Sequence, residues 1–194
     1  ELKQNKTRLG EVDNTVAVSI IVPAYNATDY LEKNVKTYLS QTLSNIEVII
    51  VDDGSTDHTL QVAKTLQHYD KRVKVITKNN GGLSSARNAG VPVATGKYIF
   101  FIDPDDYMDD DTLEVLYESI EDTESDVAVI GYDLVYGNKR QKPGLWIQEL
   151  FSESKRKMQL KDMPGILQAS TAWGKLIRNS FYRENNLSFY DGIL

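Results

Sequence analysis

Three carboxylates stand within four positions at Asp103, Asp105 and Asp106, directly after the apolar run 98–102. Carboxylates held this close repel one another, and a divalent cation relieves the repulsion. Ligands that are all oxygen favour Mg²⁺ or Mn²⁺, which usually share their coordination with substrate phosphates. The spacing therefore predicts a metal-assisted phosphate site, and a solvated acidic turn is the alternative for so short a motif taken alone.

The first apolar run of the chain, 17–22, also ends in residues suited to a ligand. They stiffen the chain, offer a ring for stacking on a base and offer a side-chain amide: Pro23, Ala24, Tyr25 and Asn26. Ligands of parallel sheets bind beyond the carboxyl ends of the strands. This run is therefore predicted to line one side of a nucleotide pocket.

Carboxylates and a glycine-rich turn follow the second and third apolar runs. Asp52 and Asp53 can accept hydrogen bonds from a uracil ring or from ribose hydroxyls. Asn80 precedes two glycines that permit close backbone approach and open a helix, whose N-terminus favours anions. Arg87, in that helix, is predicted either to face a phosphate or to form a salt bridge with an aspartate of the site.

Apolar runs alternate with amphipathic segments along the first two thirds of the chain. The predicted strands are 17–22, 46–51, 73–77, 97–102 and 126–136, and the predicted helices begin near positions 28, 55, 84 and 113. Strands that alternate with helices imply an α/β fold with a mostly parallel sheet and helices on both faces. The polar groups at the strand ends are then expected to meet at one edge of the sheet.

Composition narrows the class of protein. The chain has 194 residues, 41% of them hydrophobic, and no cysteine, which excludes disulfides and thiolate metal sites. No Lys or Arg lies between Asp103 and Asp126, and this acidic block argues against nucleic acid as a partner.

A basic stretch at 139–161 is interpreted as a solvated surface, with an anionic acceptor or a membrane surface as alternatives. We expect a cytoplasmic location, with the cytoplasmic face of the membrane as the second option.

Three parts are distinguished along the chain. Residues 1–15 lack periodicity and are predicted to be a tail or linker. Residues 16–142 carry the strand and helix pattern and are predicted to form the nucleotide-binding core; the family resemblance described next implies that this core binds a nucleotide sugar. Residues 143–194, in which the periodicity weakens, are predicted to be the acceptor-side part of the same domain, truncated at its C-terminus.

Four stretches of the sequence resemble family 2 glycosyltransferases, which have the GT-A (Rossmann-like) fold. They are 18–26, 47–57, 80–90 and 98–106, with a weaker match at 172–176 and Phe189. The resemblance implies inverting transfer of a hexosyl or N-acetylhexosaminyl group from a UDP-linked donor to an acceptor hydroxyl. It further implies a saccharide, lipid-linked or protein-linked acceptor, in cell-envelope or extracellular polysaccharide or glycoconjugate synthesis.

The same resemblance assigns roles to residues at matching positions. The base pocket falls to Pro23, Ala24, Tyr25 and Asn26, uracil or ribose to Asp53 and Asp52, and enclosure of the nucleotide to Asn80 and Arg87. Asp105 is implied to ligate Mn²⁺ or Mg²⁺ with support from Asp106, while Asp103 contacts ribose, the metal or a metal-bound water. Trp173 is implied to lie near the sugar or acceptor, and core packing is its alternative role.

The catalytic base is expected just after Leu194. Family members carry it in a Glu-Asp pair that follows a lead-in resembling 189–194 of this chain. Two other functions are weighed: a non-catalytic nucleotide-sugar-binding domain of a larger protein, and a nucleotidyltransferase. The second requires a glycine-rich loop with Arg or Lys after the first strand, and the run that begins at Pro23 does not supply one.

Overall fold

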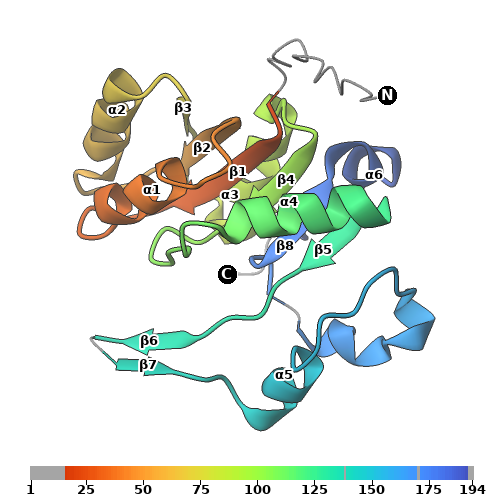
Figure 1. Cartoon of the computed structure of the whole chain (residues 1–194). Helices are drawn as coiled ribbons and strands as arrows, with labels where there is room; N and C mark the ends of the chain where they lie inside the picture. The colour runs from red at the N-terminus through yellow and green to blue at the C-terminus, as the bar shows by residue number, and fades with distance from the viewer. Residues whose placement is uncertain (1–15, 138, 170, 192–194) are drawn as a thin grey trace, which may run out of the picture.

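A computed structural model describes residues 16–137, 139–169 and 171–191, so the predicted tail at 1–15 lies outside the described residues. A six-stranded sheet forms the centre of the molecule (Figure 1). Its strands, in spatial order, are β3 (Val73–Thr77), β2 (Ile46–Asp52), β1 (Val18–Ala24), β4 (Tyr98–Phe101), β8 (Lys175–Arg178) and β5 (Val127–Val129). The first four are mutually parallel, and β8 is antiparallel to both of its neighbours. The predicted α/β class with a mostly parallel sheet is confirmed.

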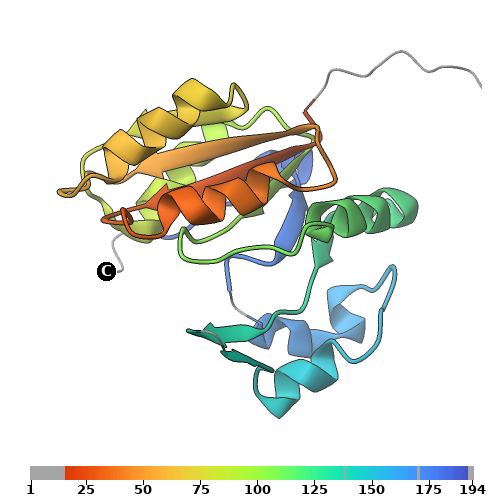
Figure 2. The same cartoon turned by 60° about the vertical axis from the view of Figure 1, so that its left-hand side comes forward.

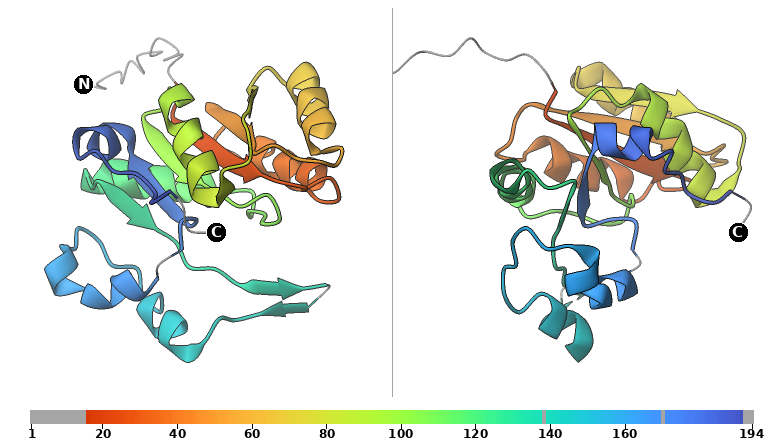
Figure 3. Two further views of the ribbon diagram at one scale, coloured as in Figure 1. Left: turned by 180° about the vertical axis from the view of Figure 1, so that it is seen from behind. Right: turned by 90° about the vertical axis from the view of Figure 1, so that its right-hand side faces the viewer.

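Helices cover both faces of the sheet because the central strands are apolar on both sides. Every residue of β1, β2 and β4 is buried. One face packs against α1 (Leu31–Leu39), α2 (Thr59–Tyr69) and α4 (Thr112–Thr123). The other face, seen from behind in Figure 3, packs against α3 (Gly82–Gly90), the 3-10 turn η1 (Val91–Val93) and α6 (Asn179–Glu184).

Close packing of α3 on the sheet depends on Gly90. A Cβ atom at this position would lie 2.5 Å from Cγ2 of Ile21 in β1, a distance that side chains do not tolerate. The sequence predicts a helix over 84–94 whose pattern is weakened by Gly90 and Pro92. The helix accordingly ends at Gly90 and continues as a 3-10 turn that contains Pro92.

Four details differ from the sequence-based expectation. Pro23 does not end the first strand but lies inside β1. The pairing of β1 with β4 ends at Ile21, so the missing N–H of Pro23 removes no hydrogen bond between these strands. The strand predicted for 126–136 is two strands, because β6 (Leu134–Tyr136) pairs with β7 (Lys139–Gln141) in a separate hairpin. Helical spacing predicts Tyr69 on the same side of its helix as Val62 and Leu66, but Tyr69 is exposed. Strand β8 was not predicted, because its four residues carry little local signal.

The chain leaves the sheet after β5 and returns to it only at β8. The excursion contains the β6–β7 hairpin, α5 (Leu145–Leu150), η2 (Leu160–Asp162) and η3 (Pro164–Gln168), and it lies apart from the sheet (Figure 2). We call residues 130–174 the arm. The predicted boundary between 142 and 143 falls within the arm and stays a prediction. None of the helices in the described part of the chain is both long and apolar enough to cross a membrane.

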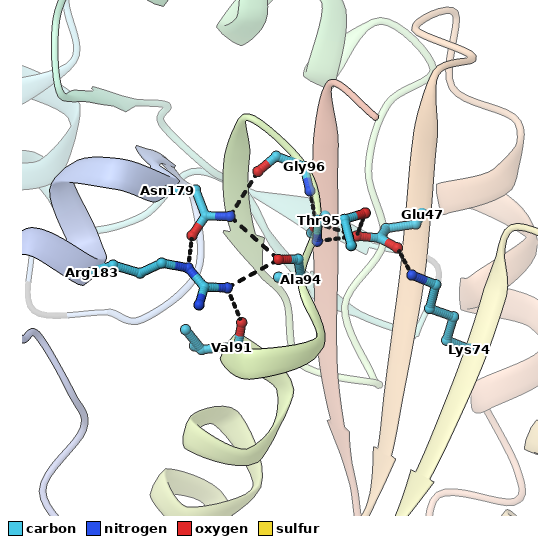
Figure 4. A network of polar contacts seen from close by, with 9 residues as sticks. Glu47, Lys74, Val91, Ala94, Thr95, Gly96, Asn179 and Arg183 are labelled. Carbon is cyan, nitrogen blue, oxygen red and sulfur yellow. Dashed lines mark hydrogen bonds and ion pairs between the residues drawn. The ribbon is translucent and has the colours of Figure 1, made fainter. Parts of the chain in front are cut away.

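A polar network ties the chain together at the edge where β1, β2 and β4 begin (Figure 4). Oε1 of Glu47 accepts hydrogen bonds from the Ser19 hydroxyl at 2.6 Å and from the amide and hydroxyl of Thr95 at 2.7 and 2.9 Å. Oε2 forms an ion pair with Lys74 at 2.5 Å. The side chains of Asn179 and Arg183 in α6 donate to the carbonyls of Gly96 and Val91 nearby.

Candidate functional site

The loop after β4, which carries the clustered aspartates, is held by polar side chains of α1. The Asn34 amide donates to the carbonyl of Pro104 at 2.9 Å, and the Tyr38 hydroxyl donates to the carbonyls of Asp106 and Asp103 at 2.6 and 3.2 Å. Farther along the loop, the Gln41 amide donates to the carbonyl of Asp109 at 2.8 Å. The loop is therefore shaped by the protein itself, with its backbone turned toward the helix.

These three side chains were not predicted as site residues. Asn34 and Tyr38 share the buried face of α1 with Leu31 and Val35, and Gln41, just after the end of the helix, is also buried. Buried polar groups are costly unless they are hydrogen-bonded, so polar residues in an apolar helical stripe indicate a fixed polar partner. That pattern is visible in the sequence, but the partner is not.

The aspartate loop concentrates negative charge. Burial first, and then the neighbouring charges of Asp105 and Asp103, raise the pKa of Asp106 to about 6. Burial, together with these carboxylates, also raises the pKa of the Tyr38 hydroxyl, which therefore stays protonated and continues to donate. Asp105 is exposed, and its carboxylate has no hydrogen bond or ion pair within the described ranges. The loop thus presents one unengaged carboxylate beside one that is reluctant to ionise.

Asp103 lies on the α3 side of the sheet and forms an ion pair with Arg87. Side chains alternate between the two faces of a strand, so Asp103 follows Ile99 and Phe101, which pack against α3. Nη2 of Arg87 donates to Oδ1 of Asp103 at 2.6 Å, and the arginine is only 8% exposed. Of the two roles predicted for Arg87, the structure shows the salt bridge to an aspartate of the site.

Asp53 occupies the N-terminus of α3. Its carboxylate accepts hydrogen bonds from the amides of Gly81 at 3.1 Å and Gly82 at 2.7 Å, and it forms an ion pair with Lys78 at 2.6 Å. The anion that this helix end favours is therefore supplied by the protein. Lys78 was not singled out in the sequence, and both oxygens of Asp53 are already engaged. Its predicted contact with uracil or ribose stays a prediction.

The loops after β1 and β2 are tied to each other. Oδ1 of the Asn26 side chain accepts a hydrogen bond from the backbone amide of Thr56 at 2.9 Å, and the backbone amide of Asn26 donates to the Ser55 hydroxyl at 3.1 Å. Asp52 is buried and accepts from the Ser55 amide at 3.3 Å. The loops that carry Asn26 and Asp52 therefore lie together, and both side chains already have protein partners. Their predicted contacts with the base or ribose stay predictions.

The remaining predicted residues of this region differ in accessibility. Pro23 and Ala24 are buried within β1, whereas Tyr25 exposes 47% of its surface. Asn80 is exposed beside Gly54, at which a Cβ atom would lie 2.8 Å from the Asn80 amide nitrogen. Tyr25 and Asn80 can therefore meet a ligand directly, while the two buried residues shape the strand beneath.

A pocket of about 360 Å³ opens between the aspartate loop and the arm. Asp105 and Asp106 line it on one side, and Tyr132, Trp173 and Arg140 line it from the arm. The rings of Tyr132 and Trp173 meet edge to face, with centroids 4.6 Å apart. Trp173 therefore lines a pocket beside the aspartates and packs against another aromatic ring, while its predicted place near the sugar or acceptor stays a prediction.

The metal prediction can be tested against the donor set. Within the described residues, no group of three or more His, Cys, Asp and Glu side chains is arranged to hold a metal ion. The chemistry of the loop nevertheless fits Mg²⁺ or Mn²⁺, since Asp105 is unengaged and Asp103 has only one oxygen, Oδ1, in its ion pair. A site for Mn²⁺ or Mg²⁺ on Asp105 and Asp103 therefore stays a prediction.

The chain is similar to known proteins in sequence and in fold. The sequence profile described as glycosyl transferase family 2 matches residues 19–184. The chain belongs to this family. It is 35% identical over 178 residues to the uncharacterized glycosyltransferase EpsJ of Bacillus subtilis, covering 91% of this chain and 52% of EpsJ. Over 104 residues it is 43% identical to the hyaluronan synthase of Pasteurella multocida, covering 54% of this chain and 11% of the synthase.

Solved structures confirm the GT-A fold class. The crystal structure of TarS 1–349 of S. aureus in complex with UDP-GlcNAc superimposes with a TM-score of 0.78 at 28% identity, covering 90% of this chain and 49% of that one. The chain therefore spans about half the length of EpsJ and of TarS 1–349. The predicted family and fold are both confirmed.

Proposed function

We propose that this chain is the donor-binding part of a glycosyltransferase that moves a sugar from a UDP-linked donor to an acceptor hydroxyl with inversion. The observation that carries the proposal is the aspartate loop, in which Asp105 and Asp106 face an aromatic-lined pocket. The complexes of TarS with UDP and with UDP-GlcNAc support a uridine nucleotide as the donor. The hyaluronan and chondroitin synthases among the relatives support a role in polysaccharide synthesis.

The chain's own residues account for donor binding. Tyr25, exposed at the end of β1, offers a ring for the base, and Asn80 offers an amide on the opposite loop. Asp52 and Asp53 shape the floor between these loops, where their hydrogen bonds hold the backbone in place. Because α1 fixes the aspartate loop, little rearrangement is needed when the donor binds.

Asp105 and Asp103 would hold Mn²⁺ or Mg²⁺, with Asp106 in support. The ion supplies positive charge where the diphosphate leaving group gains negative charge. Asp103 is oriented for this role by Arg87, and Asp106 lies next to Asp105 in a loop whose backbone is held by Tyr38. A cation at the loop would also offset the like charges of Asp105 and Asp103, which together with the larger effect of burial raise the pKa of Asp106.

The sugar of the donor would occupy the pocket between the aspartate loop and the arm. Aromatic rings stack on the apolar faces of sugars, and Tyr132 and Trp173 provide such rings opposite Asp105. An acceptor hydroxyl would attack the anomeric carbon from the face opposite the diphosphate while a carboxylate removes its proton. That base is still predicted just after Leu194, outside the described residues.

The proposal also covers the class of acceptor and the location of the protein. The basic residues between Lys139 and Lys161 lie on the arm, and one of them, Arg140, lines the pocket. They would suit an anionic or lipid-linked acceptor at the cytoplasmic face of a membrane. A saccharide or protein-linked acceptor is equally compatible with an aromatic-lined pocket.

A ligand panel tests the proposal. Thermal unfolding of the chain would be measured with UDP-GlcNAc, UDP-glucose and GDP-mannose, each with and without Mn²⁺. A UDP-linked sugar that binds the folded state stabilises it by about 2.7 kcal/mol at one hundred times its dissociation constant. We expect this gain for UDP-linked sugars in Mn²⁺ and a much smaller one for GDP-mannose.

The same panel distinguishes an enzyme from a binding module. Slow release of free sugar from the bound donor, dependent on Mn²⁺, indicates a transferase that uses water in place of its acceptor. Binding without turnover, including in a longer chain that continues past Leu194, favours the non-catalytic module. Absence of stabilisation by every nucleotide sugar would contradict the proposed function.

A further inference from the structure

The segment that follows α6 is hydrogen-bonded to α3 through the Asn88 side chain. The Asn88 amide nitrogen donates to the carbonyl of Phe189 at 2.8 Å, and the Phe189 amide donates to Oδ1 of Asn88 at 2.9 Å. The same nitrogen donates to the carboxylate of Asp191 at 3.0 Å. One carboxamide thus pairs with both backbone groups of Phe189, which requires a donor and an acceptor on the same side chain.

The docked phenylalanine covers the arginine of the site. The Phe189 ring centroid lies 5.2 Å from Cζ of Arg87, within the range of a cation–π contact. The ring also meets Phe101, the last residue of β4, edge to face at 5.0 Å. Phe189 therefore lies between the end of β4 and the guanidinium group that holds Asp103.

The buried position of Arg87 leaves one of its donors without a hydrogen bond, which is energetically unfavourable. Its Nε is buried and has no hydrogen-bond partner within the described residues, although Nη2 is bound to Asp103. A buried donor without a partner is destabilising, and water would satisfy it if the guanidinium turned outward. The Phe189 ring favours the inward position, because a desolvated cation is attracted to an aromatic face.

We propose that Asn88 and Phe189 are positioning residues of the donor site, acting through Arg87 on Asp103. The chain of contacts runs from the Asn88 amide to the Phe189 backbone, from the Phe189 ring to Arg87, and from Arg87 to Asp103. This inference rests on the proposed function, since it assigns Asp103 to the donor site. It makes donor affinity depend on residues 187–191, which lie outside the range 19–184 that the family profile matches.

Packing of α6 does not require this anchor. Asn179 and Arg183 already fix the helix at the opposite edge of the sheet, and Tyr182 is buried against Phe101. The Asn88 amide adds nothing to those contacts and determines only where Phe189 and the residues after it lie. Loss of the Asn88 hydrogen bonds is therefore expected to affect Arg87, whereas loss of the Asn179 or Arg183 hydrogen bonds is not.

Calorimetric titration with UDP in Mn²⁺ tests the inference in the 194-residue chain. Asn88→Asp places a carboxylate against the Phe189 carbonyl, and Phe189→Leu keeps apolar volume without an aromatic face. Each is expected to weaken UDP binding about three- to tenfold, the range of a partly desolvated cation–π contact. Phe189→Tyr keeps the ring and should restore wild-type affinity. Asn179→Ala, the matched control, should lower stability and leave UDP affinity within about twofold, since a surface far from a site contributes little to it.

A second readout examines Arg87 without any ligand. In an NMR spectrum of the arginine Nε–H groups, the wild-type Arg87 signal should be protected from solvent exchange and shifted by the Phe189 ring. Phe189→Leu should remove the shift, and Asn88→Asp should reduce the protection. An unchanged Arg87 signal in Asn88→Asp overturns the inference, as does equal loss of UDP affinity in Asn179→Ala. If the wild-type chain does not bind UDP, the proposed function fails, and the NMR comparison still decides the positioning role.

Discussion

The two edges of the central sheet differ in how the charge of Glu47 and of Asp106 is balanced. At the edge where the strands begin, Glu47 is bound by Ser19, Thr95 and Lys74 (Figure 4). Burial alone would raise the pKa of Glu47, but these donors outweigh it and hold the pKa below its usual value. At the edge where the strands end, burial and like charges raise the pKa of Asp106 to about 6.

The difference indicates which edge is structural and which is functional. A carboxylate with a full set of donors stabilises the fold and has no capacity left for a ligand. Carboxylates that repel one another are retained at a cost, and perturbed pKa values of this kind cluster at functional sites. Asp53 and Asp103 also lie at this second edge but have partners in the protein. Both oxygens of Asp53 are engaged by Lys78 and the α3 amides, whereas Asp103 is paired with Arg87 through one oxygen.

The largest effect is expected for Asp105→Asn at the functional edge. We expect UDP affinity in Mn²⁺ to fall at least about 100-fold, since losing even an outer partner of a metal ligand costs roughly 10- to 100-fold in metal affinity. Titration of UDP with and without Mn²⁺ measures it. Asp110→Asn, an exposed acid of the same loop, is the matched control and should bind normally. Equal UDP affinities of the Asp105 variant and the wild type in Mn²⁺ would contradict a metal ion bound by Asp105.

The next largest effect is expected for Glu47→Gln at the structural edge. The change leaves Lys74 without its ion pair, so the free energy of unfolding should fall by about 2 kcal/mol. Lys74 is partly exposed, which keeps the loss below that of a fully buried pair. Urea unfolding measures the loss, and UDP titration should show unchanged affinity. A weakened UDP affinity in this variant would mean that the two edges are coupled.

A pair of tyrosines sharpens the comparison at smaller scale. Tyr38→Phe removes the hydrogen bonds to the Asp103 and Asp106 carbonyls, and Tyr98→Phe removes one to Glu121 at the opposite edge. Each should cost about 1 kcal/mol of unfolding free energy. Only Tyr38→Phe should also weaken Mn²⁺-dependent UDP binding, by a few-fold, because the aspartate loop loses a support. Similar UDP affinities in the two variants would show that the loop keeps its shape without the hydroxyl.

The smallest effect is a difference in acid sensitivity. The pKa of Glu47 is lower in the folded chain than its ordinary value of 4.5, so its contribution is present above pH 4.5 and is lost as the pH falls through the folded value. The Glu47→Gln variant lacks this titration, and its unfolding free energy should decline less steeply below pH 4.5 than that of the wild type. Asp106 titrates in both proteins, so its contribution cancels when their unfolding free energies are compared. Parallel curves from chemical unfolding at several pH values would contradict the assignment.

Local patterns determined much of the donor side. Continuous apolar runs placed the strands β1 to β4 within a few residues of their observed ends, because strands buried on both faces contain few polar residues. The aspartates at those ends followed from the sequence as well, since a parallel sheet gathers its strand ends at one edge. Aspartates 103, 105 and 106 could thus be selected from their types and spacing alone.

Only the tertiary structure decided which partners these residues have. The support of the aspartate loop by Asn34 and Tyr38 joins positions about seventy residues apart, and the Asn88–Phe189 pairing joins positions 101 apart. The insertion of β8 between β4 and β5 likewise pairs short strands that are distant in the chain. Periodicity reports which face of an element is buried and carries no record of what lies against that face. The sequence therefore located the carboxylates, and the packing of distant segments decided which were neutralised and which were left for a ligand.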